Sequence, residues 1–285
     1  MAIFFALITL IGWGVGDVFV TLASRRHGNI PTIFWGQVVS IILTSLYIPF
    51  AGNIADFGMF LIALVLGLFL SWGALFYFRA LEIGNAQLAG TISGSFVLPV
   101  VLLSVIFFGE KLTLIQVFGI VLILIGLVLS SFELGQLKNK KIREIFSDKG
   151  VKYAFLAMII WGVYYAVIRI PAESIGWFWT FYPANLFFIT LLIFGKIKRS
   201  ALKIFTDKKA LFYIVIFSLL INIASFSYNL GILNGFTSVV APIAGSYSVL
   251  FVILARLIFK EKLTRQQSFG IVLSLLGIVL ISFAS

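Results

Sequence analysis

The sequence predicts an all-α integral membrane protein whose ten transmembrane helices form two inverted five-helix repeats. Hydrophobic residues make up 61% of the chain and charged residues only 11%, against about 25% charged residues in soluble proteins. The second half also repeats motifs of the first. FGEKLT at 108–113 returns as FKEKLT at 259–264, an offset of 151, and WGV at 13–15 returns at 161–163, an offset of 148. Two copies of five spans each must enter a membrane from opposite sides.

Ten apolar stretches follow one another along the chain. Most reach the ~20 residues that a helix needs to cross ~30 Å of hydrocarbon. They lack the strict alternation of barrel strands, so helices are expected. In order, the stretches cover 2–22, 32–50, 57–78, 87–108, 114–132, 151–169, 175–194, 210–231, 237–259 and 265–283.

The repeats divide the chain into two domains, 1–133 and 151–285. A basic linker at 134–150 joins them and is the longest polar segment of the sequence. A second basic segment, 196–209, alternates apolar and basic residues, which favours a short helix at the membrane interface.

The distribution of charge predicts the topology. The net charge is +11, and all but Lys111 and Arg169 of the 21 Lys and Arg residues follow odd-numbered helices or lie at their ends. Because Lys and Arg mark the cytoplasmic side, both termini are expected outside. This pattern favours contact with anionic lipid in the plasma membrane and argues against nucleic-acid binding.

Few residues could support enzyme chemistry. The chain has no cysteine, and its one histidine, His27, falls in a predicted loop. No nucleotide-binding loop or paired carboxylate stands out. We therefore expect no enzyme activity, no metal and no cofactor.

The repeated motifs resemble those of the drug/metabolite transporter superfamily, in its ten-helix EamA-type branch. The resemblance covers nearly the whole chain. It rests on the Trp-Gly pairs at 13–14 and 161–162, on ALEIG at 80–84, and on the duplicated Glu-Lys-Leu-Thr with the glycines that follow it, Gly119 and Gly270. The resemblance implies a carrier that exchanges small metabolites, amino acids or drugs by alternating access. The chain departs from the family where Thr91 stands in place of the proline found as Pro242. Members are also commonly described with both termini in the cytoplasm, which conflicts with the charge pattern.

Asp17 is the only acidic residue clearly inside an apolar stretch. A carboxylate there is costly unless it is protonated, paired or hydrated, and such residues usually serve function. It could couple transport to protons or bind a substrate ammonium. Alternatively, it could be a structural partner of Arg25 or Arg26.

Other polar and aromatic residues fall at helical spacings that suggest a cavity. Ser218, Asn222, Ser225 and Asn229 form one polar stripe, which could line a cavity or bond between helices. Trp161 and Tyr165 share a face in mid-span, where their polar atoms need partners. Gln37 and Asn185 stand at equivalent positions of the two repeats. The predicted substrate site comprises Trp13, Asp17, Gln37, Trp161, Tyr165, Asn185, Asn222 and Ser225.

The sequence therefore predicts a secondary transporter of small metabolites, with amino acids or related compounds as the first substrate class. A cationic drug or a sugar-type solute is the alternative within transport. A lipid flippase or a membrane scaffold is the alternative outside it. The expected partners are a small-molecule substrate, the lipid bilayer and protons as a coupling ion, in a monomer or a homodimer.

Overall fold

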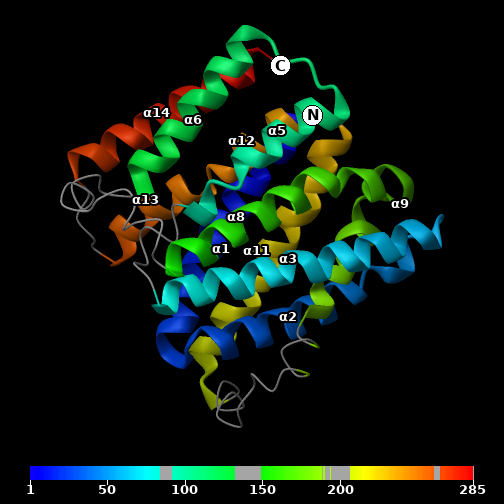
Figure 1. Ribbon diagram of the computed structural model, residues 1–285. Helices are drawn as coiled ribbons and strands as arrows, with labels where there is room; N and C mark the ends of the chain where they lie inside the picture. The colour runs from blue at the N-terminus through cyan, green and yellow to red at the C-terminus, as the bar shows by residue number, and fades with distance from the viewer. Residues whose placement is uncertain are drawn as a thin grey trace.

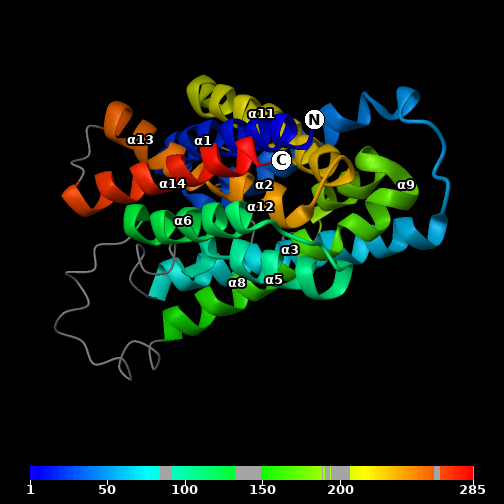
Figure 2. The same ribbon diagram turned by 90° about the horizontal axis from the view of Figure 1, so that it is seen from above.

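The computed structural model is a bundle of helices (Figures 1 and 2) and describes residues 1–83, 92–131, 149–187, 189, 193, 206–259 and 264–284. No strand occurs among these residues. The first half contributes α1 (Ala2–His27), α2 (Asn29–Ser45), α3 (Phe57–Ile83), α5 (Val97–Phe108) and α6 (Leu114–Ser131), with the short 3₁₀ helix η1 (Ile48–Phe50). The second half contributes α8 (Lys149–Val167), α9 (Arg169–Phe181), η3 (Tyr182–Phe187), α11 (Lys208–Leu233), α12 (Thr237–Gly245), α13 (Tyr247–Phe259) and α14 (Arg265–Phe283).

Several helices are long and apolar enough to cross a membrane. In the described part of the chain, six segments qualify by length and hydropathy, and α12 and α13 together form one of them. Shorter apolar helices cover Ile30–Ser45, Ile92–Phe108 and Leu114–Ser130. Large apolar side chains such as Phe118 on α6 and Phe269 on α14 are 59% and 58% exposed, as lipid-facing residues should be. An all-helical, multi-pass architecture is thus confirmed, whereas the number of ten spans stays a prediction.

The stretch expected at 175–194 is not one straight helix in its described part. α9 bends at Gly176, which has a φ of 76° inside the helix, and η3 then continues in 3₁₀ form to Phe187. A glycine accepts this left-handed conformation without the steric penalty of a Cβ atom. Residues 134–148 and 196–205, which include most of the linker and of the expected interfacial helix, lie outside the described residues.

Helices of the two halves pack against each other reciprocally. The first helix of one half packs against the third helix of the other, because α1 lies on α11 and α8 lies on α3. The last helices, α6 and α14, run side by side (Figure 1), and α5 packs on α12. The core of the protein is therefore the surface shared by the halves rather than two separate cores.

The repeated Trp-Gly motif makes the same contact twice. A Cβ at Gly14 would lie 2.9 Å from the carbonyl oxygen of Tyr247, and a Cβ at Gly162 would lie 3.3 Å from that of Phe96. Phe96 and Tyr247 are themselves equivalent, at an offset of 151. Both follow a local break, where Ser95 and Ser246 donate their N–H to the carbonyl three residues earlier. The glycines let a helix approach these breaks closely.

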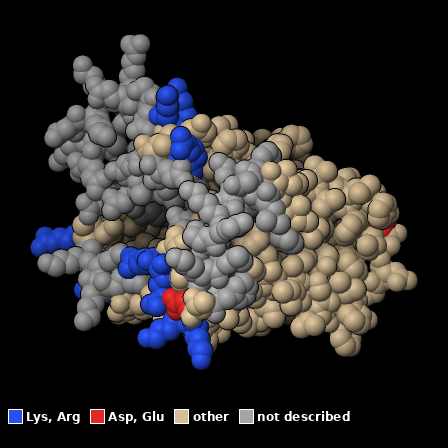
Figure 3. Space-filling view, turned by 90° about the horizontal axis from the view of Figure 1, so that it is seen from below, with Lys and Arg blue, Asp and Glu red and all other residues tan. Residues whose placement is uncertain are grey.

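The two ends of the molecule differ in charge. Figure 3 shows Lys and Arg gathered toward one end, and the rest of that face is almost free of charge. Arg25 and Arg26 end α1, Lys208 and Lys209 begin α11, and Arg265 begins α14. Both termini lie at the other end, because α1 ends and α14 begins at these residues (Figure 1). The assignment of the basic end to the cytoplasm stays a prediction.

Candidate functional site

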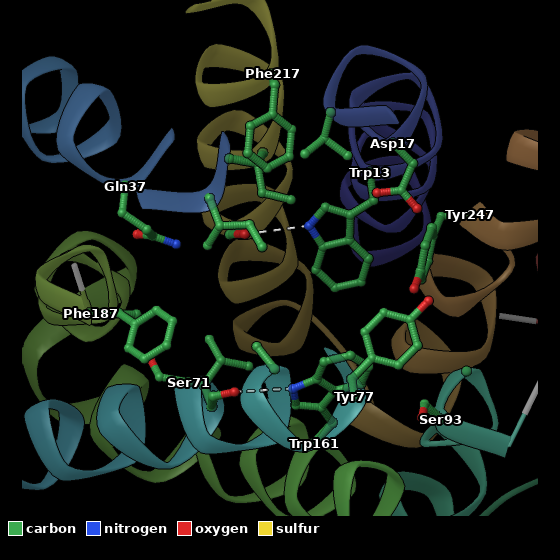
Figure 4. A pocket seen from close by; sticks show the side chains of 18 of the residues that line it. Trp13, Asp17, Gln37, Ser71, Tyr77, Ser93, Trp161, Phe187, Phe217 and Tyr247 are labelled. Carbon is green, nitrogen blue, oxygen red and sulfur yellow. Dashed lines mark hydrogen bonds between the residues drawn. The ribbon is translucent and has the colours of Figure 1, made fainter. Parts of the chain in front are cut away.

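One cavity of about 570 Å³ lies between the central helices, and seven of the eight predicted site residues line it (Figure 4). α1 supplies Trp13 and Asp17, and α2 supplies Gln37. The second half supplies Trp161 and Tyr165 from α8, Asn185 from η3 and Ser225 from α11. Asn222 is the exception, since it lies behind this lining and is 5% exposed.

Equivalent positions of the two halves meet across this cavity. At the offset of 148, Asp17 is equivalent to Tyr165 and Gln37 is equivalent to Asn185, and all four residues line the cavity. At the offset of 151, Ala74 corresponds to Ser225 and Phe96 to Tyr247. The pairs Trp13/Trp161, Ile33/Phe181 and Leu70/Ile221 follow the same rule.

Aromatic side chains form one wall of the cavity. The Trp13 ring lies 5.4 Å from Tyr165, 5.5 Å from Tyr247 and 5.8 Å from Tyr228, measured between centroids. Its Nε1 donates to Ser225 Oγ at 3.4 Å. The other indole, Trp161, donates to the carbonyl oxygen of Leu70 at 3.1 Å. Both tryptophans are thus fixed by a hydrogen bond, and their faces can receive a cation or another ring.

The Asp17 carboxylate has no ion-pair partner among the described residues. Tyr77 and Tyr247 are near enough to interact with it electrostatically, and Figure 4 shows Tyr247 beside it. Arg26, one of its suggested structural partners, instead bonds Asp207 at 2.7 Å. Arg25, which lines the cavity mouth, has an interaction of its own. Asp17 is therefore placed to receive a proton or a substrate cation.

An amide chain forms the opposite wall. Asn185 Nδ2 donates to Asn222 Oδ1 at 3.0 Å, and Asn222 Nδ2 donates to the Ser218 carbonyl oxygen at 2.6 Å. Asn222 therefore orients a lining amide rather than lining the cavity itself. Gln37 lies across the cavity from Asp17 (Figure 4), and its Oε1 is buried without a hydrogen-bond partner in the described part of the chain. Ser225 lines the cavity from the same polar stripe, whereas Asn229 bonds the Trp177 carbonyl oxygen.

The cavity extends toward the basic end of the molecule. Ser24 and Arg25, in the last turn of α1, are part of its lining. In the other direction Tyr164 and Tyr228 are each 1% exposed, and the Tyr228 hydroxyl donates to the Tyr165 carbonyl oxygen at 3.0 Å. Both rings pack against Tyr165, which lines the cavity.

The predicted site leaves out several aromatic residues of the lining, among them Phe96 and Tyr247. Phe96 and Tyr247 belong to the repeated triplets Gly-Ser-Phe and Gly-Ser-Tyr, at 94–96 and 245–247. That repetition was the available signal. No group of three or more His, Cys, Asp or Glu residues that could hold a metal ion occurs in the described ranges.

Comparisons with known proteins agree with this architecture. The profile of the EamA-like transporter family matches residues 1–132 and 148–283. An uncharacterized protein of Methanocaldococcus jannaschii is 30% identical over 139 residues, which are 48% of this chain and 99% of that protein. A crystal structure shares the fold with a TM-score of 0.74, over 99% of this chain and 96% of the other, at 18% identity. The chain is a multi-pass membrane protein that belongs to the EamA-like transporter family.

Proposed function

We propose that this protein is a secondary transporter that moves amino acids or related small metabolites by alternating access. The two units are residues 1–133 and 151–285, joined by the linker at 134–150 and inverted relative to each other. The observation that carries the proposal is a cavity to which both halves contribute equivalent positions, such as Gln37 and Asn185. A site at the interface of inverted repeats can open to either side by exchange of the two conformations.

The described lining reaches toward the basic end at Ser24 and Arg25, and we assign it to the state that opens at that end. If the basic end is cytoplasmic, this is the inward-facing state. The opposite state follows when the halves exchange conformations, so that the second-half equivalents of Ser24 and Arg25 line a mouth at the other end. Motions of this kind take microseconds to milliseconds.

The chemistry of the cavity supports a substrate with both an amine and an acid group. The Asp17 carboxylate can bind an ammonium, and the neighbouring aromatic rings add a cation–π contribution of about 0.5–2 kcal/mol. The Gln37 amide and the Ser225 hydroxyl can donate to a carboxylate.

An organic cation without an acid group is the second candidate. The Asp17 carboxylate, which has no ion-pair partner in the described part of the chain, and the aromatic wall favour it, because both bind positive charge. A volume of about 570 Å³ accommodates either class, since ligand pockets usually span ~300–1,000 Å³.

Thermal stabilisation of the purified protein separates these candidates. The panel contains an amino acid, its decarboxylated amine, its deaminated acid and a sugar of similar size. A ligand at ~100 times its Kd stabilises the folded state by ~2.7 kcal/mol. We expect a raised unfolding midpoint with the amino acid only. Stabilisation by the amine alone would select the cation, and stabilisation by the sugar alone would refute both. Uptake of the stabilising compound into proteoliposomes then tests transport itself.

A further inference from the structure

A buried carboxylate joins three elements at the end of the molecule that carries the termini. Glu110 follows the end of α5, and its side chain is 2% exposed. It accepts hydrogen bonds from the backbone N–H of Thr237 at 2.7 Å and of Ser238 at 2.8 Å, and from the Ser238 hydroxyl. It also pairs with Arg169 Nη1 at 2.9 Å. Glu110 thus caps the N-terminus of α12 and ties it to the start of α9.

Arg169 completes the cluster. Its Nε donates to Glu173 Oε1 at 2.7 Å, and its guanidinium carbon lies 5.8 Å from the centroid of the Phe108 ring. Glu173 is a peripheral member, because its side chain is 56% exposed and it bonds only within α9 in the described structure. Within this cluster, the ion pair between the halves is the one formed by Glu110 and Arg169.

The repeat places this cluster where a second cavity mouth is expected. Thr21, Ser24 and Arg25 line the present cavity toward the basic end. At the offset of 148, their equivalents are Arg169, Ala172 and Glu173. Ser24 is partly exposed, whereas Ala172 is 1% exposed. Of the three pairs, Ser24 and Ala172 thus differ in exposure: the position is partly exposed at the basic end and buried at the other.

We propose that the Glu110–Arg169 pair is a latch that holds the second mouth closed, and that it breaks when the transporter opens toward the end that carries the termini. This inference rests on the proposed alternating access. The latch has two states, one with the carboxylate paired and one with it hydrated, because a buried carboxylate that is separated from its partners must become hydrated. Opening of the mouth supplies that water to both charged groups.

Cysteine accessibility tests the latch without a substrate. The chain has no cysteine, so Ala172→Cys and Ser24→Cys place a single thiol at equivalent positions of the two mouths. Each is combined with Arg169→Gln, which removes the charge of the pair, or with Glu173→Gln as the matched control. Glu110→Gln removes the other charge of the same pair and is the second disrupted variant. A third thiol, Ile123→Cys, reports on a fully buried site of α6 away from both mouths.

We expect Arg169→Gln to raise the maleimide labelling rate at position 172 about tenfold and to lower the rate at position 24, because loss of a charged hydrogen bond shifts a two-state equilibrium by about that factor. Glu173→Gln should leave both rates near those of the parent. An unchanged rate at position 172 in both disrupted variants would refute the latch. Parallel gains at positions 172 and 123 would show a general loss of packing and would refute it as well. A protein that labels as expected but binds no compound of the panel would contradict the proposed substrates and not the latch.

Discussion

The substitution Asp17→Asn tests the role of the carboxylate in the cavity most directly. It keeps the shape and hydrogen-bonding capacity of the side chain but removes its charge and its titration. Among the described residues the carboxylate has no ion-pair partner, so no structural pair is broken. Folding and membrane insertion should therefore be retained.

The size of the effect follows from the contact that is lost. A hydrogen bond to a charged group contributes about 1.5–3 kcal/mol, and more than a neutral one. If Asp17 binds the substrate ammonium, the variant should bind ~10- to 150-fold more weakly. If Asp17 carries only the coupling proton, substrate affinity should change little, but accumulation driven by a pH gradient should be abolished.

Two assays in proteoliposomes separate these roles. The first measures accumulation against a pH gradient, and the second measures substrate exchange at equal pH. Loss of accumulation with retained exchange indicates proton coupling, and loss of both indicates direct binding of the substrate. Asp56→Asn is the matched control, because Asp56 is exposed near the start of α3. Wild-type rates in both assays for Asp17→Asn would refute a functional role of Asp17.

Four further predictions concern the cavity, the topology and the stability of the fold. Asn222→Leu should reduce transport strongly at normal expression, because Asn185 loses its bond to Asn222 Oδ1. The lipid-facing control Ile223→Leu should transport at the wild-type rate. A wild-type rate for Asn222→Leu as well would show that the polar stripe serves only helix packing. Single cysteines at Asn139 and Ser200 should be shielded from an impermeant thiol reagent in cells, and efficient external labelling of both would reverse the topology. Gly277→Ala should lower the unfolding free energy in detergent by about 1–3 kcal/mol, because its Cβ would lie 2.6 Å from the Gly119 carbonyl oxygen. Gly16→Ala is the control, since the atom nearest to a Cβ there is 3.7 Å away. Equal unfolding midpoints for the two variants would contradict this reasoning. The Arg26 side chain, helped by the Ala210 N–H and His27, holds the pKa of the Asp207 carboxyl well below its ordinary 3.8. The charged carboxylate therefore stabilises the fold above pH 3.8, and this stabilisation is lost as the pH falls below 3.8. The difference in unfolding midpoint between wild type and Asp207→Asn should shrink from about pH 5 to about pH 3, and a constant difference would contradict this.

Seven of the eight residues singled out in the sequence line the cavity, because polar and aromatic residues are rare and costly in a membrane span and therefore stand out. Asp17 stands out by its charge alone, and Trp13 and Trp161 by their repetition. The same reasoning could not tell that Asn185 lines the cavity and Asn222 does not, because an amide on a polar stripe can face a cavity or another amide. Only the packing of α11 against its neighbours places Asn222 behind Asn185.

The sequence by itself determined the helical class, the positions of most helices and the equivalence of the two halves. Apolar length, charge distribution and repetition are local properties of the chain, and a membrane converts them into helices because backbone groups cannot stay unpaired in lipid. Tertiary structure decided what depends on distant contacts. It broke the expected helix after Gly176, brought Tyr247 and Phe96 into the cavity, and buried Glu110 at the start of α12. The Glu110 motif marks a turn in the sequence, but its partner Arg169 lies 59 residues away, and only the packing of the two halves brings these charges together.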